Sequence, residues 1–224
     1  MRLYRIEVAV FAIAFTVFGL VALAVAWSGG WAYELLARLS GHPEAFFVTD
    51  RGATNVDLAG LLQWHGRWAA YVLGLSPSAP TSAFFTADEY AHMADVRAVF
   101  RGAEVAGILA LFVALYRIGR ARRRGDALRL VRAGTLTAAG VVVLIGLAAA
   151  LAFDALFLAF HEVFFPQGNF LFPPDSNLIR LYPEWYWQGI TAGVGISFIA
   201  LALIAAVAAH RALRRRATTY TRAA

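Results

Sequence analysis

The stretch that decides the fold class is Val8–Trp27, whose sequence is VAVFAIAFTVFGLVALAVAW. It runs for 20 residues without a charge, and about 20 predominantly apolar residues are what a helix needs to cross the hydrocarbon core of a membrane. The apolar part of a secretory signal peptide is shorter, so we interpret the stretch as a membrane anchor. Because 60% of the residues are hydrophobic and only 15% are charged, the composition also excludes intrinsic disorder.

Three more apolar stretches follow, and the four together predict membrane spans at about 8–27, 98–116, 133–155 and 186–209. The second stretch is uncharged only over Val105–Tyr116, so to cross a membrane its helix must extend back through Glu104 and Arg101. We therefore predict an all-α membrane protein in which residues 1–224 form a single integral membrane domain. Its four transmembrane helices would carry an extracytoplasmic cap built from two loop segments, residues 28–97 and 160–185.

The orientation follows from the arginines, which number 20 with no lysine and give a net charge of +6. Fourteen of the 20 flank the spans on one side: Arg2, Arg5, Arg117, Arg120, Arg122, Arg123, Arg124, Arg129, Arg132, Arg211, Arg214, Arg215, Arg216 and Arg222. The positive-inside rule places this side, with both termini, in the cytoplasm. We interpret the basic blocks as topology signals and as contacts with membrane lipid, and we expect no nucleic-acid partner.

Several kinds of site are excluded by missing motifs. The chain has no cysteine, which excludes disulfides, a thiolate nucleophile, cysteine-based metal sites and the membrane thiol oxidases. No HExxH motif occurs, because HEVFF has Phe165 in place of the second histidine. No GxSxG motif occurs either, and Ser82 and Ser176 have no visible base nearby. We predict no bound metal and no cofactor.

The two outer segments differ in how much they predict. The first contains an amphipathic helix with Asn55 as its N-cap and Gly74 at its end, flanked by Trp64, Trp68 and Tyr71. Such a helix either lies in the membrane interface or packs as part of a cap, and the sequence leaves both open. The second segment is aromatic and rich in proline, which favours a non-helical lid. Residues 28–54 predict nothing further.

A candidate general base stands where the second span begins. Thr86 and Glu89 resemble a capping box, so a helix should start near Ala87 and run into the span. Glu89, His92 and Asp95 then follow at steps of three residues on one face. A histidine between carboxylates is held in one tautomer and kept basic, although a solvated helix end is an equal alternative. Arg101 and Glu104 form either a bracing pair or a substrate contact.

A second histidine stands where the third span ends, in the stretch FDALFLAFHEVFF. Asp154 and His161 lie two turns apart on one helical face. The second and third spans are joined by a short loop and should be antiparallel neighbours, which brings His92 and His161 to the same depth. Such a pair could form an acid/base pair, a bis-histidine haem site or part of a metal site. We expect His65 to serve interfacial packing and His210 to mark a cytoplasmic helix end.

The stretches EYAHMADVRAVF and FDALFLAFHEVFFPQGNFLFPPDSNLIRLYPEWYW together resemble the bacterial lipoprotein intramolecular transacylases. That family combines a His-x-x-Asp-Val stretch, a Phe-x-x-x-His-x-x-Phe-Phe stretch and an acidic Leu-Ile…Pro-Glu-aromatic segment. The matching positions are His92, Asp95, Val96, Phe157, His161, Phe164, Phe165, Asp175, Leu178, Ile179, Pro183 and Glu184. One departure is Phe170, where the family often has tryptophan.

The resemblance implies an acyltransferase of the bacterial cytoplasmic membrane, with its site at the outer leaflet. Its substrate would be the N-terminal cysteine of a diacylglyceryl lipoprotein, whose sn-2 acyl chain moves to the α-amine. His92 and His161 would be catalytic, with a slight preference for His92 as the base. Glu89, Asp95, Asp154 and Glu162 would support them, and Arg101, Glu104, Asp175, Glu184 and Trp185 would bind substrate. We expect a monomer. The alternative is a non-enzymatic membrane protein that holds haem or quinone between His92 and His161.

Overall fold

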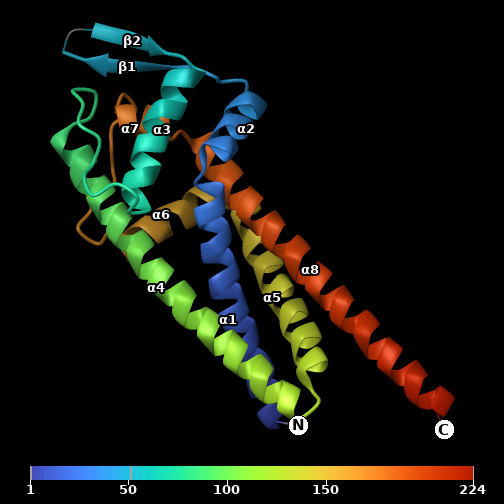
Figure 1. Cartoon of the computed structure of the whole chain (residues 1–224). Helices are drawn as coiled ribbons and strands as arrows, with labels where there is room; N and C mark the ends of the chain where they lie inside the picture. Colours follow the sequence, from blue (N-terminus) through green and yellow to red (C-terminus); the bar gives the residue numbers. More distant parts are fainter. Residues whose placement is uncertain (1, 51, 224) are drawn as a thin grey trace. The chain divides into compact units, whose positions relative to one another are not determined.

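The computed structural model describes residues 2–50 and 52–223, with the side chains of residues 4–50 and 52–216. The side chains of Arg2 and Arg222, two of the arginines that set the predicted orientation, lie outside this part. Four of the described helices are long and apolar enough to cross a membrane, as predicted. They are α1 (Arg2–Trp27), α4 (Ala87–Arg123), α5 (Ala127–Leu151) and α8 (Glu184–Ala223), drawn in Figure 1.

Helix α4 is longer than a membrane span requires. Its 37 residues make about 55 Å of helix at a rise of 1.5 Å per residue, whereas the hydrocarbon core is about 30 Å thick. The predicted capping box is confirmed: the Glu89 amide donates to Thr86 Oγ1 at 3.3 Å, and the Thr86 amide donates to Glu89 Oε2 at 2.7 Å. The first turns of α4, which carry the charged stretch up to Arg97, therefore lie ahead of its membrane-spanning part.

The chain forms two compact units, of which the first contains the residues up to Leu23, Glu104–Ala150 and the residues from Val194 onward. Small residues let its helices approach closely. A Cβ atom added at Gly134 would stand 2.2 Å from the Phe11 ring, and one at Gly19 would stand 2.6 Å from the Phe198 ring. Small residues at the interface are typical of helices that associate in lipid, where close packing rather than apolar burial drives association.

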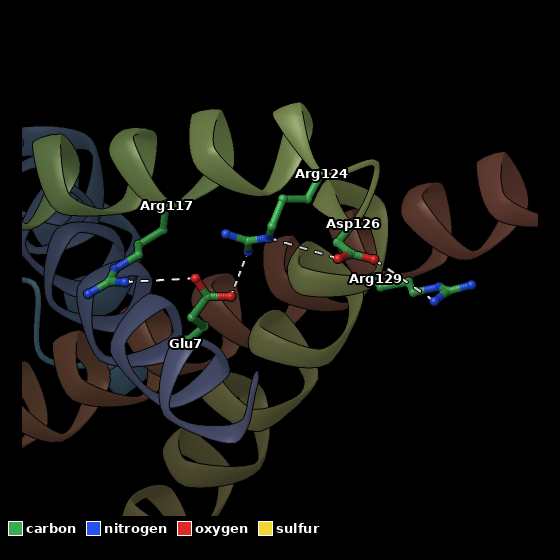
Figure 2. A network of polar contacts seen from close by, with 5 residues as sticks. All are labelled: Glu7, Arg117, Arg124, Asp126 and Arg129. Atoms are coloured by element: carbon green, nitrogen blue, oxygen red, sulfur yellow. Dashed lines mark hydrogen bonds and ion pairs between the residues drawn. The ribbon is translucent and has the colours of Figure 1, made fainter. Parts of the chain in front are cut away.

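A carboxylate that the sequence analysis did not single out lies at one end of this first unit. Glu7 accepts a hydrogen bond from Arg124 at 2.6 Å and lies 4.0 Å from Arg117. Arg124 also lies 4.0 Å from Asp126, which in turn is 3.9 Å from Arg129 (Figure 2). The network joins α1 to the turn between α4 and α5.

The second unit contains Ala24–Ala103 and Leu151–Gly193. It holds α2 (Gly30–Ser40), β1 (Ala45–Thr49), β2 (Gly52–Val56), α3 (Leu58–Val72), α6 (Phe153–Phe164), α7 (Asn177–Leu181) and the adjoining ends of α1, α4 and α8. Its core is aromatic and aliphatic, with Tyr33, Phe47, Leu61, Trp68, Phe85, Leu178 and Leu181 among the buried residues.

The predicted helical membrane fold is confirmed, and the two-stranded hairpin β1–β2 is a local exception to its all-α character. The strands are antiparallel, with Phe47 opposite Thr54. Phe47 is buried while Phe46 and Val48 are exposed, as the alternation of a strand requires. Asn177 occupies the outer edge of β1, because its Oδ1 accepts from the Val48 amide at 2.8 Å and its Nδ2 donates to the Val48 carbonyl at 2.7 Å. A side chain from α7 thus satisfies a strand edge, which no local pattern in residues 28–54 could predict.

Helix α3 begins and packs differently from its prediction. Its N-cap is Asp57, whose carboxylate accepts from the Gly60 amide at 2.9 Å, and Asn55 instead donates from β2 to Glu44 at 3.0 Å. Gly74 follows the helix with a φ of 70°, as its predicted end requires. Trp68 and His65 are both buried in the second unit. Of the two alternatives left open by the sequence, the structure therefore supports a packed helix over one lying in the membrane interface.

Two secondary-structure boundaries differ from their prediction. The third membrane helix breaks before its predicted end, and the proline-rich segment contains a short helix. Helix α5 ends at Leu151, because Ala152 leaves the helical region with φ −148° and ψ 52°, and α6 starts afresh at Phe153. The predicted non-helical lid contains the short helix α7, whose N-cap Ser176 accepts from the Ile179 amide at 3.4 Å.

His65 is a buried histidine with only one of its two ring nitrogens hydrogen-bonded. Its Nε2 lies 3.1 Å from the Ser28 carbonyl, so the proton of the neutral ring sits there. Nδ1 is buried and has no hydrogen-bond partner within the described part of the chain. Tyr33 stacks on the ring at 4.7 Å. A second proton would be buried without an acceptor, and burial lowers the pKa of His65 to about 4.

We expect this histidine to make the protein acid-sensitive. The unfolded chain takes up a proton near a pKa of about 6.5, and the native ring does so only near 4, so stability is complete above pH 6.5 and falls as the pH approaches 4. The loss should amount to about 3 kcal/mol. Thermal unfolding in detergent at several pH values would measure it, and His65→Gln should remove most of it. The exposed His42, changed to glutamine, is the control, and an unchanged pH dependence in His65→Gln would contradict the assignment.

Candidate active site

The two histidines singled out in the sequence meet in the second unit. His92 comes from the first turns of α4 and His161 from the last turn of α6. Their ring centroids are 6.2 Å apart, and the ring planes differ by only 18°. The predicted convergence of His92 and His161 is therefore confirmed, although it is α6 rather than a continuous third span that carries His161.

His161 is held in a defined tautomer by its own helix. Its Nδ1 lies 2.8 Å from the carbonyl oxygen of Phe157, one turn earlier. A carbonyl oxygen only accepts hydrogen bonds, so the proton of the neutral ring sits on Nδ1. The lone pair of Nε2 is then available to accept a proton. This is the arrangement that a general base requires.

His92 has a different environment. Its side chain is 8% exposed, and Nδ1 is buried without a hydrogen-bond partner in the described residues. Burial and the neighbouring His161 lower the pKa of His92, and Asp95 and Asn169 oppose this only in part. His92 is therefore a neutral imidazole near pH 7, which can donate one hydrogen bond but binds a proton weakly.

Phenylalanines enclose both imidazoles. Phe165 is 2% exposed and contacts both rings, at centroid distances of 4.9 Å from His92 and 5.4 Å from His161. Phe172 lies 5.4 Å from His92, while Phe157 and Phe170 lie 4.2 and 5.2 Å from His161. An apolar surround strengthens electrostatic interactions within the site.

Asp95 connects α4 to the segment between α6 and α7. Its Oδ2 accepts from Asn169 Nδ2 at 2.6 Å and from Gln167 Nε2 at 2.8 Å. Asn169 also interacts with His92, so the amide links the carboxylate to the imidazole. No sequence motif marks Asn169, and its only local signal is the turn at Gly168, where φ is 77°.

Glu89 does not flank His92 as its spacing suggested. It is 1% exposed, and besides the Thr86 amide it accepts from the Ser176 hydroxyl at 2.5 Å and from the Leu178 amide at 2.9 Å. One carboxylate therefore caps both α4 and α7. It anchors the end of the aromatic segment between α6 and α7. The tautomer of His92 is therefore set by groups other than Glu89. The Ser176 hydroxyl is engaged in the same cap.

Most of the other predicted site residues have exposed side chains, and two of them contact residues other than the histidines. Asp154 is exposed in the first turn of α6, where a carboxylate interacts favourably with the helix dipole. Glu162 and Asp175 are exposed, and Glu184 accepts a hydrogen bond from Gln188. Trp185 packs on Tyr33 at 5.9 Å.

The charged pair predicted on α4 lies where that helix enters its apolar part. The Arg101 guanidinium covers Gly74, where an added Cβ atom would stand 1.6 Å from Nη2. Arg101 and Glu104 both interact with other groups of the chain. No three potential metal-binding side chains of the histidine, aspartate or glutamate type come together in the described ranges 2–50 and 52–223.

We expect Asn169 to position His92. Asn169→Ala breaks its charge-assisted hydrogen bond to Asp95, worth about 1.5–3 kcal/mol, and should reduce kcat about tenfold with little change in KM. Gln167→Ala removes the other bond to Asp95, and a bond to Asn169 Oδ1 at 3.1 Å, but leaves the bond between Asn169 and Asp95 in place. It should reduce kcat less than about threefold. Equal losses in the two variants would show that the whole segment matters rather than Asn169.

Comparison with known families decides the class of this site. The family model described as "Lipoprotein intramolecular transacylase Lit" matches residues 8–187 of the chain. The chain belongs to this family. It is therefore an acyltransferase embedded in the membrane, as the sequence motifs implied. A comparison with curated protein sequences found no match.

Solved structures agree on the fold. The membrane integral lipoprotein intramolecular transacylase Lit from Bacillus cereus has a TM-score of 0.70 with this chain at 15% sequence identity, covering 100% of this chain and 99% of the other. A variant of the same protein with a histidine replaced by alanine has a TM-score of 0.73 at 15% identity, covering 97% and 96%. A variant with a histidine replaced by arginine has a TM-score of 0.67 at 13% identity, covering 97% and 95%.

Proposed function

We propose that this transacylase moves the sn-2 acyl chain of an S-diacylglyceryl-cysteine to the α-amino group of the same cysteine. The product is an N-acylated lipoprotein with a lyso-glyceryl thioether. The observation that carries the proposal is the pair of stacked imidazoles, 6.2 Å apart at their centroids, in a chain of the transacylase family. Both reacting groups belong to one substrate molecule, so the site has only to align them.

The amine nitrogen attacks the ester carbonyl, forming the new N–C bond and a tetrahedral intermediate. His161 Nε2 accepts the amine proton, because Nδ1 is already committed to the Phe157 carbonyl. The intermediate then expels the sn-2 oxygen, and the proton returns to this oxygen as the C–O bond breaks. The protonated form of an α-amine has a pKa of about 7.7–8.0, so the transfer of its proton to an imidazole costs little near neutral pH.

His92 stabilises the negative charge that develops on the carbonyl oxygen. A buried neutral imidazole can donate one hydrogen bond to that oxyanion, and the apolar surround makes such a bond stronger than in water. This assignment reverses the preference drawn from the sequence, in which His92 was the base. The reason is that Glu89, expected to keep His92 basic, instead caps α7. The alignment of amine and ester can itself supply up to about 7–11 kcal/mol of the barrier reduction.

Mass spectrometry of the lipoprotein N-terminus provides the test. We expect the purified protein to convert a diacylated lipoprotein into a product of equal mass, with one acyl chain found on the cysteine nitrogen by fragmentation. A mixture of light and isotope-labelled lipoproteins should yield no product that combines a light peptide with a heavy acyl chain. Mixed products would contradict intramolecular transfer, and an unmodified amine would contradict the acceptor.

We also propose that both termini are cytoplasmic, that the site faces the outer leaflet, and that the protein acts as a monomer. The orientation is supported by the 14 arginines on one side of the spans against six on the other. An engineered cysteine at Ser82 should react with a membrane-impermeant maleimide in intact cells. A cysteine at exposed Arg122 is the matched control and should react only after permeabilisation. The opposite result would reverse the topology.

A further inference from the structure

A hollow at the C-terminal end of α4 has no part in the proposed acyl transfer. It is open, has a volume of about 370 Å³ and is lined by Tyr116, Arg120, Arg123 and Arg124. Spacings of four and three residues put Tyr116, Arg120 and Arg123 on one face of α4, and Arg124 follows directly after the helix. The hollow belongs to the first unit of the chain, whereas both histidines belong to the second.

Positive charge exceeds negative charge around this hollow. Arg124 is held by Glu7 at 2.6 Å and lies 4.0 Å from Asp126 (Figure 2). In the part of the chain that the structure describes, Arg120 and Arg123 have no hydrogen-bond or ion-pair partner and are exposed. Two guanidinium groups therefore remain for an anion, and the planar fork of arginine matches the oxygens of a phosphate.

An apolar row leads into the hollow along the same face of α4. Val105, Ile108 and Phe112 are 59%, 55% and 64% exposed, and each lies three or four residues from the next. Tyr116 follows four residues later, at the boundary between the row and the arginines. An amphipathic aromatic ring is typical of the level of the lipid headgroups. The face thus offers an apolar track that ends in a basic hollow.

We propose that this face binds one anionic glycerophospholipid, with its phosphate in the hollow and an acyl chain along the row. Arg120 and Arg123 contact the phosphate, and Arg124, oriented by Glu7, adds to the local positive charge. A zwitterionic lipid also has a phosphate, but the surplus of arginines disfavours its ammonium group. Free phosphate would bind the arginines but would make no contact with the apolar row.

Native mass spectrometry of the full chain in detergent tests this, with phosphatidylglycerol, phosphatidylcholine and inorganic phosphate as the probes. We expect one tightly held phosphatidylglycerol and at least tenfold weaker binding of phosphatidylcholine. The double variant Arg120→Gln/Arg123→Gln should bind phosphatidylglycerol roughly 30-fold more weakly, since each basic residue near an anionic lipid contributes roughly fivefold. Arg120→Lys, which keeps the charge and loses the fork, should lose part of the affinity.

The matched control is Arg211→Gln/Arg216→Gln, which removes two exposed arginines from α8. It should weaken phosphatidylglycerol binding less than about threefold. Equal losses in the two double variants would mean general attraction to basic residues and would overturn the site. Displacement of phosphatidylglycerol by inorganic phosphate at similar concentration would overturn the assignment of a lipid, because the apolar row would then contribute nothing.

Discussion

Replacing His161 with glutamine should slow acyl transfer by about 100-fold or more while the protein remains folded. Removal of a positioned acid or base has effects of this size. Glutamine can still donate a hydrogen bond toward the Phe157 carbonyl, which His161 Nδ1 contacts at 2.8 Å, but its amide accepts no proton from the substrate amine. The rate of conversion, followed by mass spectrometry of the lipoprotein N-terminus, measures the loss.

His92 should respond differently to the same change. As a donor to the oxyanion, it is replaced in part by the glutamine amide, so His92→Gln should lose only about tenfold. His92→Ala, which leaves no donor, should lose about 100-fold. If the two histidines act as one unit, the double alanine variant should be little worse than the worse single variant. Greater damage from His92→Gln than from His161→Gln would return the role of base to His92.

The pH dependence and the absence of an adduct complete this prediction. Turnover of the unmodified enzyme should rise through the mid-range of pH as the substrate amine loses its proton. No acyl-enzyme should accumulate, because the amine attacks the ester directly. An acyl group trapped on a serine or histidine would contradict direct transfer but not the family. His42→Gln, at an exposed histidine, should keep full activity, and full activity in both single histidine variants would contradict the site.

Much of the scaffold could be predicted from sequence, because the features that define it are local. A run of apolar residues specifies a membrane helix whatever its neighbours are, and the capping box at Thr86 marks where α4 begins. The meeting of His92 and His161 followed from one topological step, the short connection between α4 and α5. Each of these inferences needed only residues close to one another in the chain.

The rest depends on partners far away in the sequence. Spacing of three residues places Glu89 on the face of His92, but it does not say that Ser176 and Leu178 will supply the donors for its carboxylate. Asn169 has no periodicity to mark it, because it lies in an irregular segment fixed by Asp95 on α4. The hairpin was missed for the same reason: the outer edge of β1 is satisfied by Asn177, 129 residues beyond Val48.

Glu89 can be tested for two roles that predict different results. Its spacing in the sequence suggests that it keeps His92 basic, whereas in the structure it caps α4 and α7. Its carboxylate is 1% exposed and accepts from the Thr86 amide, the Leu178 amide and the Ser176 hydroxyl. Glu89→Ala leaves three donors without an acceptor, and each unsatisfied buried group costs about 1–3 kcal/mol. We expect the free energy of unfolding to fall by about 3 kcal/mol or more, measured by thermal unfolding in detergent.

Asp88→Ala is the matched control, because it removes an exposed carboxylate from the same turn of α4 and loses only its interaction with the helix dipole, about 0.3–1 kcal/mol. Glu89→Gln separates capping from catalysis. It keeps one acceptor and adds a donor that faces other donors, so stability should fall by an intermediate amount. Activity per folded molecule should change little, since Glu89 bonds to Thr86, Ser176 and Leu178, while the Phe157 carbonyl holds the Nδ1 proton of His161. If Glu89 instead kept His92 basic, Glu89→Gln would preserve stability and shift the pH profile of turnover, and that outcome would restore the arrangement inferred from spacing alone.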